Sequence, residues 1–255
     1  MELQSLSLGY ADTLVIDHVD LAIPGNAVTA IVGPNGSGKS TLLRGMARLL
    51  PARHGAVFID GDDVAGISNN RLARRLGLLP QGPVAPDGLT VGDLVSRGRF
   101  PHRSWYQRWN AEDEKAVQAA LDRVSLLDRA GDPVDQLSGG QRQRAWLAMV
   151  LAQDTPYLLL DEPTTYLDLA HAVDVMTVVR SIAHHGRRTV VCVLHDLTLA
   201  ARFADHVVVI DNGRVAAFGS PQEVFTEDLL RAVFGLQASV IDVDGAPAVV
   251  PSRHK

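Results

Sequence analysis

Eight residues from Gly33 to Ser40 have the types and the spacing that could bind phosphate. They read Gly-Pro-Asn-Gly-Ser-Gly-Lys-Ser and fit the pattern G-x-x-x-x-G-K-[ST]. Glycines let backbone N–H groups converge on phosphate oxygens, and a helix that begins after the loop adds a favourable dipole. Lys39 would reach the β- and γ-phosphates of a nucleotide, and the Ser40 hydroxyl would ligate Mg²⁺. The predicted phosphate-site residues are Gly33, Pro34, Asn35, Gly36, Ser37, Gly38, Lys39, Ser40 and Thr41.

Two carboxylates, Asp161 and Glu162, follow the apolar run Tyr157–Leu160. Many strands end in solvated carboxylates, so the pair means little by itself. Beside a phosphate-binding loop, Asp161 would hold the Mg²⁺ shell, and Glu162 would orient or deprotonate the water that attacks the γ-phosphate. The two motifs together predict nucleotide hydrolysis.

The elements that must position these groups are short buried strands that alternate with helices. The apolar runs Val28–Val32, Tyr157–Leu160 and Thr189–Leu194 are typical of parallel strands covered on both faces. We expect helices over 41–50, 141–152 and 172–184, a strand over 56–61, and a hairpin that turns at Asp211-Asn212-Gly213. The pattern predicts an α/β protein built from βαβ units.

The middle of the chain, from Thr90 to Leu151, has a different pattern, in which helical signals dominate. Asn110 is a good N-cap, and acidic residues follow it in the first turn of a helix. We therefore expect one domain, in which residues 1–89 and 152–255 form the α/β catalytic core and residues 90–151 form an inserted helical subdomain.

The composition is that of a globular protein with a sizeable core, since 46% of residues are hydrophobic and 21% are charged. A net charge of −5 gives no general reason to expect nucleic-acid binding. The single cysteine, Cys192, lies in an apolar run and is expected to be buried. The first residues lack the pattern of a signal peptide, and no apolar run approaches the ~20 residues that span a bilayer. Any membrane role would therefore be exercised from the cytoplasmic face.

The stretch Leu137-Ser138-Gly139-Gly140-Gln141, at the start of a predicted helix, is the most specific motif. Taken alone, it could be a serine N-cap followed by two glycines. Placed between the phosphate loop and the Asp161-Glu162 pair, it resembles the signature sequence of ABC ATPases, and the resemblance covers almost the whole chain. It implies a P-loop NTPase (RecA-like) core with an antiparallel β subdomain and an inserted α-helical subdomain.

The resemblance also assigns residues that the spacing alone does not. Tyr10 matches the aromatic residue that stacks on adenine, and the weaker alternative is a structural tyrosine in the first strand pair. Gln81 matches the glutamine that joins the metal site to the helical subdomain, Asp168 matches the D-loop aspartate at the dimer interface, and His195 matches the histidine that contacts the γ-phosphate. The implied catalytic residues are Glu162, His195 and Lys39. The implied metal ligands are Ser40, Gln81 and Asp161. Gln81, Ser138, Gly139, Gly140 and Gln141 complete the implied ATP site.

The mechanism that the resemblance implies needs ATP, Mg²⁺ and two copies of the ATPase. The phosphate loop of one subunit and the signature of the other would enclose each ATP, most simply in a homodimer. The helical subdomain would pass the movement to transmembrane permease subunits and, indirectly, to a substrate-binding protein. The chain would be a peripheral subunit at the cytoplasmic face of the membrane.

Two further stretches resemble the importers of ferric siderophores, haem and cobalamin: Arg97–His102 and Pro163–Leu169. They favour an ATPase for siderophore import, with haem or cobalamin import as the alternative. A soluble cluster-assembly ATPase has a compatible size, and an exporter with a separate membrane chain remains open. The mixture of arginines and aromatic residues from Arg97 to Trp109 could form a permease docking surface, a solvated loop or a nucleic-acid groove. We expect the docking surface.

Overall fold

A six-stranded sheet forms the centre of the computed structural model, which describes residues 1–103 and 108–252. Its strand order is β10-β9-β3-β8-β7-β6, and the neighbours are parallel except for the β9–β10 hairpin. Every residue of β3, β7 and β8 is buried, as expected for strands covered on both faces. The strands are β3 (Val28–Val32), β6 (Leu76–Leu79), β7 (Tyr157–Asp161), β8 (Thr189–Val193), β9 (His206–Asp211) and β10 (Arg214–Gly219).

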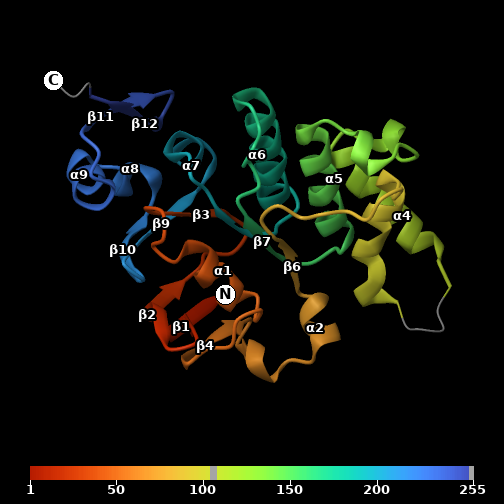
Figure 1. Cartoon of the computed structure of the whole chain (residues 1–255), viewed down its shortest axis with the longest axis horizontal. Helices are drawn as coiled ribbons and strands as arrows, with labels where there is room; N and C mark the ends of the chain where they lie inside the picture. The colour runs from red at the N-terminus through yellow and green to blue at the C-terminus, as the bar shows by residue number, and fades with distance from the viewer. Residues whose placement is uncertain (104–107, 253–255) are drawn as a thin grey trace.

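A second, four-stranded antiparallel sheet has the order β2-β1-β4-β5. Its strands are β1 (Glu2–Tyr10), β2 (Thr13–Ala22), β4 (His54–Ile59) and β5 (Asp62–Asp63). One apolar cluster unites this sheet, helix α1 (Lys39–Met46) and one face of the central sheet. This arrangement confirms the predicted antiparallel subdomain and places the phosphate loop where the two sheets meet (Figure 1).

Helix α1 differs from the expected 41–50 at both ends. It begins at Lys39, so the lysine and Ser40 lie in its first turn rather than in the loop. It ends at Met46, and Arg48 adopts a left-handed conformation with φ of 56°. Pro51 is therefore not the residue that stops the helix, because the chain has already turned three residues earlier.

Helices and short 3-10 turns form the regular structure that is described between Thr90 and Leu151, and Figure 1 shows them beside the β6 edge of the sheet. Asn110 caps α4, as predicted, by accepting from the backbone N–H groups of Glu112 and Asp113. The elements are α3 (Val91–Ser96), α4 (Ala111–Arg123), α5 (Gly139–Ala152) and 3-10 turns over Arg97–His102, Leu127–Arg129 and Val134–Gln136. Before them come a 3-10 turn (Val64–Gly66) and α2 (Asn69–Ala73).

The Arg97–His102 turn is partly buried, which the sequence pattern did not predict. Arg99 is 7% exposed; its Nε donates to Asp113 of α4 at 3.0 Å and its Nη1 to the Ala152 carbonyl at 2.9 Å. Phe100 is 60% exposed and remains available to a partner. The docking surface stays a prediction for the exposed side chains alone, and Trp105 and Tyr106 lie outside the described residues.

The elements that follow β8 lie toward the β9–β10 side of the sheet, whereas the helix between β7 and β8 packs against β3 and β8 (Figure 1). The hairpin turn at Asn212-Gly213 is confirmed, and both residues have the positive φ angles that a tight turn requires. The elements are α6 (Leu169–His184), α7 (Leu197–Phe203), α8 (Pro221–Val224), α9 (Glu227–Phe234), β11 (Ala238–Val243) and β12 (Ala246–Pro251). None of the helices in the described part of the chain has the length and apolar character to cross a membrane.

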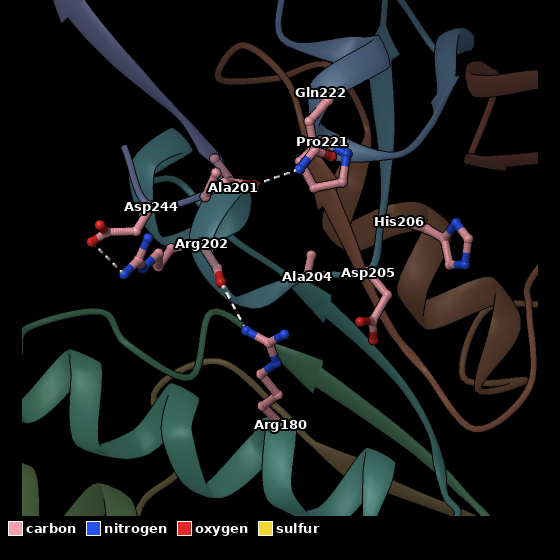
Figure 2. Close-up of a pocket in the computed structure, with 11 residues that line it drawn as sticks. Arg180, Ala201, Arg202, Ala204, Asp205, His206, Pro221, Gln222 and Asp244 are labelled. Atoms are coloured by element: carbon pink, nitrogen blue, oxygen red, sulfur yellow. Dashed lines mark hydrogen bonds and ion pairs between the residues drawn. The ribbon is translucent and has the colours of Figure 1, made fainter. Parts of the chain in front are cut away.

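A polar cavity of about 570 Å³ lies between α6, α7, α8 and the β11–β12 turn (Figure 2). Its arginines are engaged in holding the fold together. Arg202 donates to the Val243 carbonyl at 2.9 Å and lies 3.4 Å from Asp244, while Arg180 of α6 donates to the Arg202 carbonyl at 3.2 Å. The hydrogen bonds beside this cavity attach the C-terminal hairpin to the core.

Candidate active site

Backbone conformations in the phosphate loop explain its glycines. Gly36 and Gly38 have φ angles of 77° and 104°, in the region that glycine adopts without strain. A Cβ on Gly38 would also lie 2.7 Å from the Ile16 side chain. Gly38 is the N-cap of α1, so the first N–H groups of the helix have no partner within the helix and can bind an anion.

Lys39 places one positive charge at the bottom of this loop. Its side chain is folded back, and Nζ donates to the carbonyls of Gly33 and Pro34 at 2.9 Å each. Burial lowers the pKa of the Lys39 ammonium, while the charges of Glu162 and Asp161 act in the opposite direction. An arriving phosphate would therefore compete with two neutral carbonyls for a partly desolvated cation, which favours the phosphate.

Ser40 and Asp161 form an oxygen pair on the other side of the loop. The Ser40 hydroxyl donates to Asp161 Oδ1 at 2.9 Å, and Asp161 is only 3% exposed. Burial raises the pKa of the Asp161 carboxyl, and the hydrogen bond from Ser40 partly offsets that rise. Mg²⁺ prefers oxygen ligands and is usually held by one or two protein groups together with substrate phosphates. The Ser40 hydroxyl and the Asp161 carboxylate provide two such oxygens side by side, so the pair fits that requirement.

Glu162 is surrounded by three groups from three separate segments. Its Oε1 lies 2.6 Å from His195 Nε2, and its Oε2 accepts from Gln81 Nε2 at 2.6 Å. Thr165 Oγ1 donates to the same Oε2 at 2.9 Å. Burial alone would raise the pKa of the Glu162 carboxyl, but the hydrogen bonds from His195, Thr165 and Gln81 lower it below the ordinary value. Glu162 is therefore a fixed carboxylate, ionised at neutral pH.

A cleft of about 280 Å³ brings most of the predicted catalytic groups together. The loop, Lys39, Ser40, Glu162 and His195 all line it. Two neighbours of these groups were not predicted: a valine in β2 belongs to no motif, and the resemblance of the Pro163–Leu169 stretch assigned no role to its second threonine. They are Val15, which lines the cleft, and Thr165, which binds Glu162.

Tyr10 lies next to the loop helix but does not line the cleft. It is 43% exposed at the end of β1, and its hydroxyl lies 3.4 Å from Arg44 of α1. A hydrogen bond with Thr41 lowers the pKa of the phenol. The exposed ring beside α1 is compatible with stacking on a base, and that role stays a prediction.

The signature residues and Asp168 do not line the cleft either. Ser138 caps α5 in a reciprocal pair with Gln141, with hydrogen bonds of 3.3 and 3.0 Å. Asp168 caps α6 through His171, while Tyr166 beside it is 93% exposed. Within one chain these groups do not line the cleft of the phosphate loop, so in their predicted roles they would act at the site of a second subunit.

Comparison with known proteins agrees with this geometry. A family model described as "ABC transporter" matches residues 16–165. A Bacillus subtilis chain assigned to a siderophore transport system as its ATP-binding protein is 48% identical over 97% of this chain and 91% of its own. The ferric enterobactin transport ATP-binding protein of Escherichia coli is 44% identical over 97% of this chain and 92% of its own.

Solved structures are similar over comparable lengths. A transporter assigned to the metal-chelate ABC type, in an inward-facing conformation, aligns with a TM-score of 0.84 and 25% identity, covering 99% of this chain and 96% of the other. A dimeric bacterial ABC transporter cassette aligns with a TM-score of 0.76 and 27% identity, covering 86% of this chain and 97% of the other.

Proposed function

This chain belongs to the ABC transporter family, and we propose that it is the ATP-hydrolysing subunit of an importer of iron–siderophore complexes. The observation that carries the proposal for hydrolysis is the fixed Glu162 carboxylate in the same cleft as the phosphate loop. The cargo rests on relatives named for siderophore and ferric enterobactin transport, at 48% and 44% identity.

ATP binding begins at the phosphate loop. The N–H groups at the start of α1 and the Lys39 ammonium bind the phosphates, and the exposed Tyr10 ring stacks on the base. Ser40 and Asp161 would hold Mg²⁺, with Gln81 as a further ligand candidate, and the ion supplies neutralisation of the phosphate charge. Gln81 is bound to Glu162 here, so its side chain would exchange partners when it serves the metal.

Hydrolysis needs a water placed in line with the γ-phosphate. Glu162 takes a proton from that water as its oxygen attacks the γ-phosphorus and the bond to the ADP oxygen breaks. Thr165 keeps the Glu162 carboxylate in position. His195, now 2.6 Å from Glu162, is the group that contacts the γ-phosphate. Phosphoryl transfer depends mainly on such positioning and on charge stabilisation.

Two subunits complete each site. The signature residues Ser138–Gln141 of one subunit meet the ATP held by the other, which explains why they lie away from this chain's own cleft. Closure and opening of this dimer drive permease subunits through the helical segment, and the chain acts at the cytoplasmic face of the membrane as a peripheral subunit. The permease in turn works with a substrate-binding protein.

Exchange of Glu162 for glutamine tests the reaction. Glu162→Gln keeps the size of the side chain but removes the base, so the purified transporter should lose about 10²–10⁴-fold in ATP turnover and retain ATP binding. The matched control is Glu227→Gln, an exposed glutamate in the first turn of α9. Turnover of Glu162→Gln at the rate of the Glu227→Gln control would refute Glu162 as the base.

Uptake of radio-iron bound to the host's own siderophore tests the cargo. A strain that lacks this chain should regain uptake with the wild type and with Glu227→Gln, but not with Glu162→Gln. Normal uptake in the deletion strain would refute iron–siderophore import as the required role, and labelled haem and cobalamin would then be tested in the same strains.

A further inference from the structure

The imidazole of His171 packs directly on the signature motif of its own subunit. Gly140, in the first turn of α5, is buried, and the three atoms nearest to an added Cβ would all belong to His171. The Cδ2 atom would lie 2.6 Å from that Cβ, and Cγ would lie 2.9 Å from it. Gly140 therefore leaves the space that the histidine ring occupies, and a larger residue would push α5 and α6 apart.

The same ring binds the D-loop, which we define as Thr164–Asp168. His171 Nδ1 lies 2.7 Å from Asp168 Oδ1, and the backbone N–H of His171 donates to the same oxygen at 2.9 Å. The backbone bond is an ordinary helix cap that any residue at this position could make. The second bond needs the histidine ring, and it links the capping residue Asp168 to the ring that touches Gly140.

One side chain thus joins the two segments that a subunit presents to its partner. Tyr166 and Leu169, on either side of Asp168, are 93% and 68% exposed, so this end of α6 carries apolar surface that a second copy would cover. The ring contact is already present in the single subunit. The relative position of the D-loop and the signature is therefore set before the partner arrives, which lowers the ordering cost of association.

We propose that His171 is a positioning residue that couples the D-loop to the signature motif, so that both reach the partner's ATP site together. The inference rests on the proposed function, because it needs a dimer that closes on ATP. His171 does not touch the phosphate-site cleft, so its effect would appear in dimer closure and in kcat rather than in the binding of ATP to one subunit.

Two substitutions separate the contacts of the ring. His171→Phe keeps a flat ring on Gly140 and removes the N–H group, whereas His171→Asn keeps a donor near Asp168 and removes most of the ring. His185→Phe is the control, since His185 caps the opposite end of α6 and is exposed. Each is made in the Glu162→Gln background for ATP-driven dimerisation by analytical ultracentrifugation, and in the wild type for kcat and KM.

In the variant, the ordering cost that the hydrogen bond meets in the free subunit would fall on association instead. We therefore expect His171→Phe to weaken ATP-driven dimerisation by up to about fivefold per subunit, and by up to about twenty-five-fold for a dimer of two variant subunits. His171→Asn should recover part of this loss, kcat of His171→Phe should fall with little change in KM, and its single-subunit ATP affinity should match the His185→Phe control. Its Tm should fall below that of the control by no more than about 2–4 °C, the shift expected for one hydrogen bond. Exchange of Asp168 for alanine should remove the difference between His171→Phe and wild type.

Dimerisation and kcat of His171→Phe equal to those of the control would overturn the inference. So would a fall in Tm or in single-subunit ATP affinity that accounts for the lost activity, because that would show a structural role only. A Glu162→Gln parent that binds ATP and stays monomeric would instead refute the dimer of the proposed function, and the inference with it.

Discussion

Loss of the Asp113 carboxylate should destabilise the protein far more than loss of an exposed carboxylate with the same kind of partner. Asp113 is 1% exposed and Arg99 is 7% exposed, with Arg99 Nε 3.0 Å from Asp113 Oδ1. The arginine also donates to the Ala152 carbonyl at the end of α5. The pair therefore joins the 3-10 turn over Arg97–His102, α4 and the C-terminal end of α5 in the interior of the helical segment.

The magnitude follows from burial. Exchange of Asp113 for asparagine leaves the Arg99 guanidinium charged, desolvated and without its counter-ion, which costs about 3–5 kcal/mol. For a chain of this size, 1 kcal/mol corresponds to about 2–4 °C in Tm, so we expect a fall on the order of 10 °C. The exposed pair Asp228–Arg231, with side chains 93% and 63% exposed, should contribute about 0–1 kcal/mol.

Calorimetry of Asp113→Asn and Asp228→Asn measures the contrast directly. The double variant Arg99→Met/Asp113→Leu should regain much of the lost stability, because apolar residues need no counter-ion. Equal falls in Tm for Asp113→Asn and Asp228→Asn would refute the reasoning that burial, rather than the ion pair itself, sets the cost.

Two further predictions concern buried titratable groups. Burial raises the pKa of the Cys192 thiol to about 12, so a thiol reagent at pH 8 should label the protein only after denaturation, and rapid labelling of the native protein would contradict a closed core. Burial and the hydrogen bond to Asp60 raise the pKa of Tyr157 to about 12. Because the folded state favours the neutral phenol, this contribution to stability is fully present below pH 10.0 and is lost as pH rises toward 12. Tyr157→Phe should therefore show a shallower loss of stability between these pH values in urea unfolding, and an unchanged slope would contradict the assignment.

Local motifs account for the part of the site that could be predicted from the residues themselves. The phosphate loop is contiguous, and its glycines, lysine and serine act through backbone geometry within a few residues, so their types and spacing suffice. The same holds for the Asn212-Gly213 turn and for the Asn110 cap. The helix boundaries were less predictable. Helix α1 ends at Met46, shortly before the left-handed backbone of Arg48, and an arginine does not by its type predict that conformation.

The Arg97–His102 turn contains a buried arginine, Arg99, that the sequence did not predict. Three of its six residues are basic, and such residues are usually exposed. An arginine side chain can also be buried when it pairs with a buried carboxylate. Here that carboxylate is Asp113, which belongs to helix α4. The type of residue does not distinguish the two cases, because the partner that makes burial tolerable is set by packing.

The sequence by itself determined that this chain carries a phosphate-loop motif before a helix, that it belongs with ABC ATPases, and that its core is an α/β sheet. These properties depend on neighbours in the chain or on periodicity. The tertiary structure decided which groups surround Glu162 and that His171 joins the signature to the D-loop. The contacts of Glu162 with Gln81 and His195, and of His171 with Gly140, join segments far apart in the chain. A contact between distant segments is fixed only when the strands pair and the helices pack.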